Sequence, residues 1–175
     1  MVTKDDIKVE KANAADIDSL LKICREAAST SPGTVWYEDY PNRAILEHDY
    51  SVGGLYKILY KDSIAGLFSL GDLHEFRNEF PPQKPGTKIC DMARFGLIPE
   101  LQGTGLSFDI TQIAQKLAYD GGYDVARMFA CSKQKSVVAL YEFIGFHCVA
   151  RAYRWGEEML CFQKSREEVI MEMAV

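Results

Sequence analysis

The sequence predicts a single mixed α/β domain that spans residues 1–175. Three observations support this prediction. A chain of 175 residues is long enough to bury one full hydrophobic core. Its composition, with 47% hydrophobic and 26% charged residues, is ordinary for a globular protein. Segments with strand and helix patterns alternate along the chain, with no internal repeat, low-complexity tract or linker between them.

The N-terminal part of the chain predicts one strand followed by two helices. Residues 7–12 favour a short strand. Asn13 and Asp16 then form a variant capping box, and apolar residues at helical spacing predict a helix through Ala28. A second helix is expected after a short break, from about Pro41 to Tyr50.

The middle of the chain predicts a hairpin, a long loop and a further strand. Residues 55–60 and 64–70 are apolar runs on either side of a polar turn, which is typical of a β-hairpin. Residues 71–86 contain three prolines and mixed charges, so we expect a long loop, and long loops in compact domains are often functional. Residues 88–98 predict the next strand.

The C-terminal part continues the alternation of helices and strands. Glycines mark most of the boundaries, because they favour helix ends and turns. We expect a helix that follows Gly105 and stops at Gly121-Gly122, a buried strand over 123–131, a short helix over 137–144, a hairpin over 146–164, and a terminal helix or tail over 165–175.

Charge, cysteine content and hydropathy exclude several classes of function. A net charge of −5 argues against a nucleic-acid partner, which a basic surface would normally bind. The five cysteines are odd in number and contain no CxxC pair, so neither a zinc site nor a disulfide framework is expected. The N-terminus lacks an apolar signal core, and no stretch is long enough to span a bilayer. We therefore expect a cytoplasmic protein with no metal and no membrane partner.

The stretch ELQGTGLSFDI, residues 100–110, raises a functional question. Gly103 and Gly105 lie between a predicted strand and a predicted helix, where the helix N-terminal amides have no intrahelical acceptor. One interpretation is a tight turn with no ligand. The other is a backbone cradle for a phosphate group, because glycines permit a close approach and the helix dipole favours an anion. Neither a Walker A pattern nor G-x-G-x-x-G is present.

A second motif, QKSVVALYEFIGF over residues 134–146, narrows the choice. Together with LIPELQGTGLS over residues 97–107, it resembles the GNAT superfamily of N-acetyltransferases, which use acetyl-CoA. The family loop reads Gln/Arg-x-x-Gly-x-Gly/Ala, and the later segment reads Asn-x-x-Ala, then Leu-Tyr-Glu, then Gly-Phe. The residues on these family positions are Leu97, Ile98, Pro99, Gln102, Gly105, Ser107, Gln134, Val137, Leu140, Tyr141, Glu142, Gly145 and Phe146.

The chain departs from the family pattern at three of these positions. Ser107 replaces Gly or Ala and adds a hydroxyl near the expected pyrophosphate. Gln134 replaces Asn and lengthens the amide side chain, and Val137 replaces Ala on a packed face. None of the three removes a charge that the chemistry needs.

The resemblance implies a fold, an activity and a set of site residues. The implied fold is a mostly antiparallel sheet of about seven strands flanked by about four helices. The implied activity is transfer of an acetyl group from acetyl-CoA to a primary amine by direct attack, without a metal. Tyr141 would protonate the leaving thiolate, because a phenol with a pKa near ~10 is protonated at neutral pH. The strand that ends at residues 97–98 would splay from its neighbour. The implied cofactor-binding residues are Leu97, Ile98, Gln102, Gly103, Thr104, Gly105, Leu106, Ser107 and Gln134.

Several alternatives stay open at this point. The general base is Asp91, Glu75, Glu79 or a water molecule. The acceptor is a small-molecule or peptide amine, such as an amino acid, a polyamine, an aminoglycoside or a protein amine, and residues 71–86 are expected to border its site. The same fold would also suit a non-catalytic acyl-CoA-binding or regulatory module, or an interaction domain without a ligand. The sequence does not decide whether the chain forms a homodimer.

Overall fold

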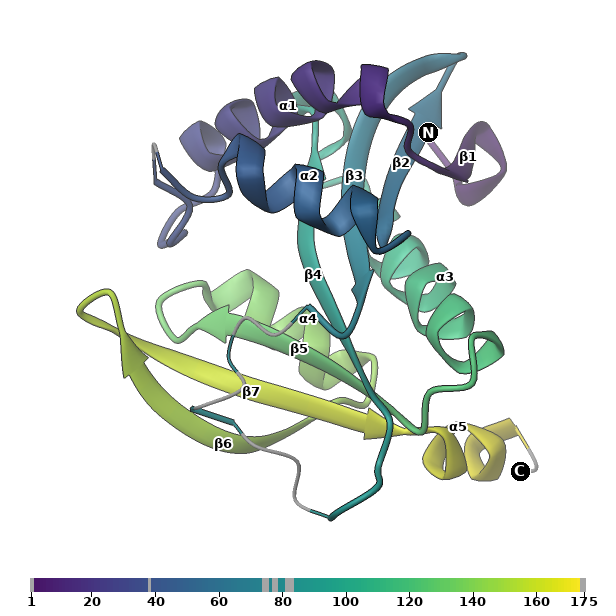
Figure 1. Ribbon diagram of the computed structural model, residues 1–175, viewed down its shortest axis with the longest axis vertical. Helices are drawn as coiled ribbons and strands as arrows, with labels where there is room; N and C mark the ends of the chain where they lie inside the picture. The colour runs from purple at the N-terminus through teal and green to yellow at the C-terminus, as the bar shows by residue number, and fades with distance from the viewer. Residues whose placement is uncertain (1, 38, 74–75, 77–78, 81–83, 174–175) are drawn as a thin grey trace.

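The computed structural model describes residues 2–37, 39–73, 76, 79–80 and 84–173. Its centre is a seven-stranded sheet in the order β1-β2-β3-β4-β5-β7-β6 (Figure 1). All neighbouring strands are antiparallel except β4 and β5, which are parallel. The predicted mixed, mostly antiparallel sheet is therefore confirmed. The strands are β1 Ile7–Lys11, β2 Leu55–Tyr60, β3 Ser63–Gly71, β4 Ile89–Leu97, β5 Val125–Cys131, β6 His147–Arg154 and β7 Glu157–Ser165.

The described part of the chain contains five α-helices, one more than the number expected. The additional helix is formed by the residues that the sequence left as a terminal helix or tail. No helix of the described ranges is long and apolar enough to span a bilayer. The helices are α1 Ile17–Thr30, α2 Arg43–Ser51, α3 Leu106–Asp120, α4 Lys135–Phe143 and α5 Arg166–Met173.

A capping box lies on the 3-10 turn Ala14–Asp16 directly before α1, and a side-chain cap starts α2. The Asn13 carboxamide accepts a hydrogen bond from Ala15 N at 3.0 Å, and Asp16 Oδ2 accepts one from Asn13 N at 2.8 Å. This capping box is as predicted, although α1 proper begins one residue beyond it. The predicted second helix is present, and it starts two residues beyond the expected position near Pro41. Asn42 caps α2 through its bond from Ile45 N, because the Asn side chain satisfies a donor that the first turn leaves unpaired.

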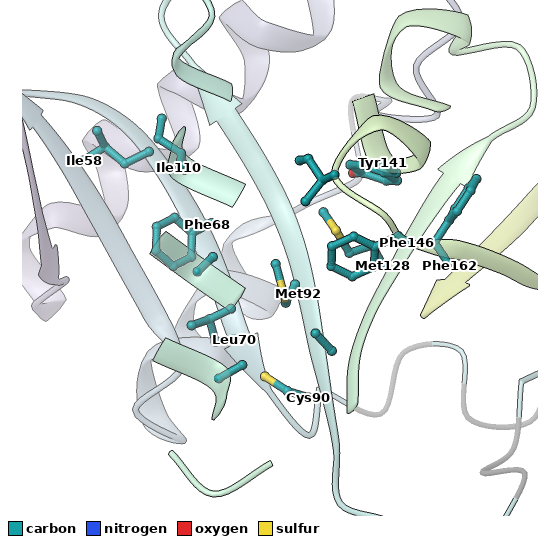
Figure 2. Packing of buried hydrophobic residues seen from close by; sticks show 14 of the residues in the cluster. Ile58, Phe68, Leu70, Cys90, Met92, Ile110, Met128, Tyr141, Phe146 and Phe162 are labelled. Carbon is teal, nitrogen blue, oxygen red and sulfur yellow. The ribbon is translucent and has the colours of Figure 1, made fainter. Parts of the chain in front are cut away.

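The sheet buries apolar side chains on both faces. Leu67 and Phe68 are consecutive in β3, so the pleat directs their side chains to opposite faces. Leu67 packs in a cluster with Leu20 of α1 and Leu46 of α2. Phe68 belongs to the larger cluster that includes Ile110 of α3 (Figure 2). The helices thus cover the sheet in two layers, with α1 and α2 on one side and α3 on the other.

The two central strands separate after a short contact. β4 and β5 pair only at Ile89↔Val125, Cys90↔Ala126 and Asp91↔Arg127. Both strands continue past this point without pairing to each other, β4 alongside β3 and β5 alongside β7. Their ribbons diverge visibly in Figure 1. The divergence leaves one edge of β4 facing a gap in the middle of the sheet.

A β-bulge in β4 lies on the diverging segment. Leu67 pairs with Gly96 and Ser69 with Ala93, so β4 carries one extra residue over this stretch. Arg94 within the bulge has φ +57°, a left-handed conformation that few non-glycine residues adopt. Its buried guanidinium lies 3.1 Å from Asp49 Oδ2 of α2, and Ser69 Oγ donates to the same carboxylate oxygen at 2.6 Å. The bulge is therefore anchored to α2 by a buried ion pair.

Candidate active site

A cavity of about 560 Å³ occupies the gap between β4 and β5. Its wall includes residues 92–97 of β4, Phe129 of β5, side chains of α4, the loop before α3, and part of the connection between α1 and α2. This volume lies within the range of small-molecule sites. The divergence of the strands therefore produces a space large enough for a ligand beside backbone groups that the sheet leaves unpaired.

The glycine loop forms one part of the cavity wall. Gly103 has φ +71° and Gly105, which directly precedes α3, has φ +92°. A Cβ atom added to either residue would meet no atom within 4 Å, so the space before both is open. Among the described residues, no acceptor receives a hydrogen bond from the amides of 103–107. These donors sit at the positive end of a 15-residue helix, which favours an anion at this edge of the cavity.

Two amide side chains on the cavity wall also hold the local backbone. Gln102 Nε2 donates to the Leu97 carbonyl at 3.0 Å and so fastens the glycine loop to the end of β4. Gln134 Oε1 accepts from Cys131 N at 3.3 Å and so ties the start of α4 to the end of β5. Both glutamines, together with Leu97, line the cavity.

Three of the expected cofactor-binding residues turn their side chains away from the cavity. Thr104 Oγ1 donates to the Leu101 carbonyl within the loop, at 2.7 Å. The Leu106 side chain is buried in the core, and Ile98 packs against the core with its amide donating to Ala65 O at 2.9 Å. The Ile98 carbonyl also accepts from Leu101 N at 3.0 Å, so only Thr104 and Leu106 retain backbone amides for a ligand. Leu97, Gln102, Gly103, Gly105, Ser107, Gln134 and Tyr141 do line the cavity.

Tyr141 combines a core position with a place on the cavity wall. Its ring lies 5.5 Å from that of Phe162 in an edge-to-face arrangement and 6.4 Å from that of Phe146 (Figure 2). Only 7% of the residue is exposed, and burial raises the pKa of its hydroxyl above the ordinary value. Within the described ranges no group hydrogen-bonds this hydroxyl. A protonated donor is therefore held at the cavity by ring packing alone.

The acidic candidates for the general base lie off the described cavity wall. Asp91 Oδ1 accepts from Arg127 Nε at 2.6 Å, and both side chains are almost completely buried. Arg127 Nη1 also donates to the Phe80 carbonyl at 2.6 Å. Glu79 lies 3.5 Å from Arg154 Nη1 and is part of a surface ion pair. Glu75 lies outside the described residues. Asp91 thus has a structural partner that accounts for its burial.

The sequence interpretation missed the aromatic part of the cavity wall. Trp36 and Tyr40 from the connection between α1 and α2, Phe76 from the loop over 71–86, and Trp155 from the turn between β6 and β7 all line the cavity. Phe76 places part of that loop on the cavity wall. A signal was present, because Trp36 and Trp155 are the only tryptophans of the chain and neither belongs to a helix or a strand. Large aromatic residues in connecting segments are worth examining as binding residues.

Comparisons with solved structures identify the fold. A GNAT-family acetyltransferase from Streptococcus agalactiae matches with a TM-score of 0.73 at 18% identity, covering 91% of this chain and 95% of the other. YncA of Salmonella typhimurium, solved with its cofactor acetyl-CoA, matches with a TM-score of 0.69 at 17% identity, covering 91% and 93%. A spermidine N-acetyltransferase chimera from Vibrio cholerae and hSSAT matches with a TM-score of 0.72 at 13% identity, covering 94% and 98%.

No protein-family model and no curated protein matches the sequence. The structural likeness extends over nine-tenths of the chain and includes the seven-stranded sheet. The chain has the fold of the GNAT acetyltransferases. Among the described residues, no group of three or more His, Cys, Asp or Glu side chains is placed to hold a metal ion.

Proposed function

We propose that the chain is an acetyl-CoA-dependent N-acetyltransferase that transfers an acetyl group to a primary amine by direct attack. One observation carries the proposal. A single cavity brings together the gap between β4 and β5, the unused amides at the start of α3 and the buried hydroxyl of Tyr141. The shared fold, and the acetyl-CoA bound to one of the fold's other members, support the choice of co-substrate.

The backbone is proposed to hold most of the acetyl-CoA molecule. The amides of residues 103–107 would donate to the pyrophosphate, because they are unpaired donors at a helix N-terminus. Beyond Asp91, the edge of β4 that faces β5 has no strand partner. The amide groups of the pantetheine arm could pair with this edge as an additional strand would. Backbone contacts of this kind depend little on side chains, so Thr104 and Leu106 are proposed to contribute through their amides.

The proposed reaction proceeds through a tetrahedral intermediate. The lone pair of a neutral amine attacks the thioester carbonyl carbon, and a backbone N–H on the free edge of β4 stabilises the oxyanion. The C–S bond then breaks, and Tyr141 donates its proton to the thiolate sulfur. The amine nitrogen loses one proton to water. A proton from water then restores the Tyr141 hydroxyl. The products are the N-acetylated amine and CoA thiol, and the protonation of the protein is unchanged.

Water is proposed as the general base because of the composition of the cavity wall. Among its described residues there is no Asp or Glu side chain. Asp91 is held by Arg127, and Glu79 is paired with Arg154 away from the cavity.

Gly105→Val is expected to weaken CoA binding by about tenfold or more. The substitution places a β-branched side chain in the open space before α3, at a φ of +92° where side chains are strained. Isothermal titration calorimetry with CoA measures the effect. Gly122→Val is a matched control, because Gly122 has φ +85° and equally open space at the other end of α3, away from the cavity. If a folded Gly105→Val protein bound CoA as tightly as the control, the pyrophosphate assignment would be wrong.

A non-catalytic acyl-CoA-binding module is the second candidate. The absence of a carboxylate from the described cavity wall is the observation that favours it. Such a module would bind CoA and release no thiol with any amine, whereas the enzyme would release thiol with at least one. A domain without a ligand would show no binding of CoA at all. A thiol-release assay with acetyl-CoA and a set of amines separates the three.

A further inference from the structure

Five aromatic side chains lie on the cavity wall, and we name this set the aromatic wall. Tyr40 contacts Trp155 with ring centroids 5.1 Å apart. Trp155 meets Phe76 edge to face at 5.8 Å, and Phe76 meets Phe129 at 4.3 Å. Trp36 is the fifth member. Four separate segments of the chain supply these residues, so the wall is assembled only in the folded protein.

Trp36 connects the aromatic wall to the diverging strand. A Cβ atom added to Gly96 of β4 would lie 3.3 Å from the Trp36 ring, so this ring rests against β4 backbone that only a glycine leaves uncovered. Gly96 belongs to the part of β4 that lies beyond the pairing with β5. The aromatic wall therefore begins beside the edge on which the thioester is proposed to bind.

The rings are held from behind by groups that do not line the cavity. Phe80 packs 5.3 Å from Phe129 and 6.0 Å from Phe76, and is itself buried. The Arg154 guanidinium lies 4.6 Å from the ring centroids of both Phe76 and Trp155. These contacts fix the rings before any ligand arrives, which lowers the entropic cost of binding against them.

The low charge of the cavity wall suits an aromatic ligand with few charges. Among the described lining residues, Arg94 is the single charged side chain, and Asp49 compensates it. The aromatic wall offers ring faces and ring edges, which attract another aromatic ring in stacked or edge-to-face geometry. A ring face also attracts one ammonium group, but a polycation such as spermidine would need carboxylates to compensate its several charges, and the described lining residues include none.

We infer that the acceptor is a primary amine carried on an aromatic body, which binds against the aromatic wall with its amino group toward β4. This inference rests on the proposed function and specifies its substrate class. Trp36 and Phe76 are the proposed specificity-determining residues, because Trp36 lies against Gly96 of β4 and Phe76 contacts two other rings of the aromatic wall.

Tryptophan fluorescence gives a test that requires no turnover. Trp36 and Trp155 are the only tryptophans of the chain and both line the cavity, so tryptophan emission reports this site directly. With CoA present at saturation, phenethylamine is expected to change the emission in a saturable manner at lower concentration than either spermidine or glycine. A response to spermidine at lower concentration, or no response to phenethylamine, would overturn the inference.

A matched pair of variants tests the aromatic wall by kinetics. Phenethylamine is expected to have a kcat/KM about tenfold or more above those of spermidine and glycine. Phe76→Leu should lower the kcat/KM for phenethylamine by about fivefold and leave the KM for acetyl-CoA unchanged, because one ring contact is lost. Phe80→Leu removes a ring that supports Phe76 and Phe129 without itself lining the cavity. Its stability should fall, and its preference for phenethylamine should change less than in Phe76→Leu.

The outcomes separate this inference from the proposed function. If spermidine or glycine is the better acceptor, or if Phe76→Leu and Phe80→Leu alter the preference equally, the acceptor class is wrong and N-acetyl transfer stands. If the protein neither binds CoA nor releases thiol with any amine, the proposed function fails. The fluorescence titration, repeated without CoA, then decides whether the cavity selects an aromatic amine.

Discussion

Tyr141→Phe is expected to lower kcat by about 10²-fold or more, the low end of what a positioned acid contributes. The substitution removes the hydroxyl and keeps the ring, which packs against Phe146 and Phe162. CoA affinity and melting temperature should change little, because no described group hydrogen-bonds the hydroxyl in the free protein. The loss should appear in kcat, since the proton transfer develops in the transition state. Thiol-release kinetics and thermal melting measure both quantities.

The matched control for this prediction is Tyr119→Phe. Tyr119 is also buried, but its hydroxyl donates to the Lys164 carbonyl at 2.8 Å and it does not line the cavity. Its loss should cost about 1 kcal/mol of stability and leave kcat nearly unchanged. Because burial raises the pKa of Tyr141, ionisation of this residue should not reduce the wild-type rate below about pH 10. Unimpaired turnover in a folded Tyr141→Phe protein, with chemistry rate-limiting, would assign Tyr141 to the core alone.

Asp91→Asn is expected to lower the free energy of unfolding by about 3 kcal/mol. The carboxylate is the buried partner of Arg127, and its removal leaves the guanidinium charge uncompensated at the last residue pair that joins β4 to β5. Urea unfolding monitored by circular dichroism measures this change. At temperatures where the variant is folded, kcat should stay within about threefold of wild type, because water is the proposed base.

The control for Asp91→Asn is Asp62→Asn, which removes an exposed carboxylate that lies 3.7 Å from Lys8. Exposed ion pairs contribute little, so the unfolding free energy should change by less than about 1 kcal/mol. The pH dependence of kcat/KM separates the two roles of Asp91. A general base would contribute an acidic limb that disappears in Asp91→Asn, together with a large loss of kcat. Such a result would restore Asp91 as the base and exclude water.

Local sequence signals were sufficient for most of the fold. Gly103 and Gly105 both have positive φ in the structure, and α3 starts directly after them. The sequence exposes this feature because glycine adopts positive φ without steric cost. The strand over 88–98 and the helix over 13–28 were placed to within a few residues by periodicity and capping. The second helix starts two residues later than expected, because Asn42 provides the cap.

The features that sequence reasoning missed depend on contacts between distant segments. The partner of Asp91 is Arg127 only because β4 and β5 adopt one particular parallel register. The anchoring of Arg94 by Asp49 requires a bulge in β4 and the docking of α2 over it. The aromatic wall combines residues from four segments that share no motif. None of these relationships has a periodicity or a spacing that a single sequence exposes.

The short contact between β4 and β5 has a consequence for how the protein opens. Three parallel residue pairs join the part of the sheet formed by β1 to β4 to the part formed by β5 to β7, and the cavity lies between the two parts. Amide protons at this junction are expected to exchange with solvent through a local opening that costs less than global unfolding. A molecule bound across the cavity would contact both parts, and its binding free energy would oppose that opening. Saturating CoA should therefore slow amide hydrogen exchange at Ala126 and Arg127 more than exchange in the pairing of β1 with β2. The bound ligand would then stabilise the junction between the two parts of the sheet.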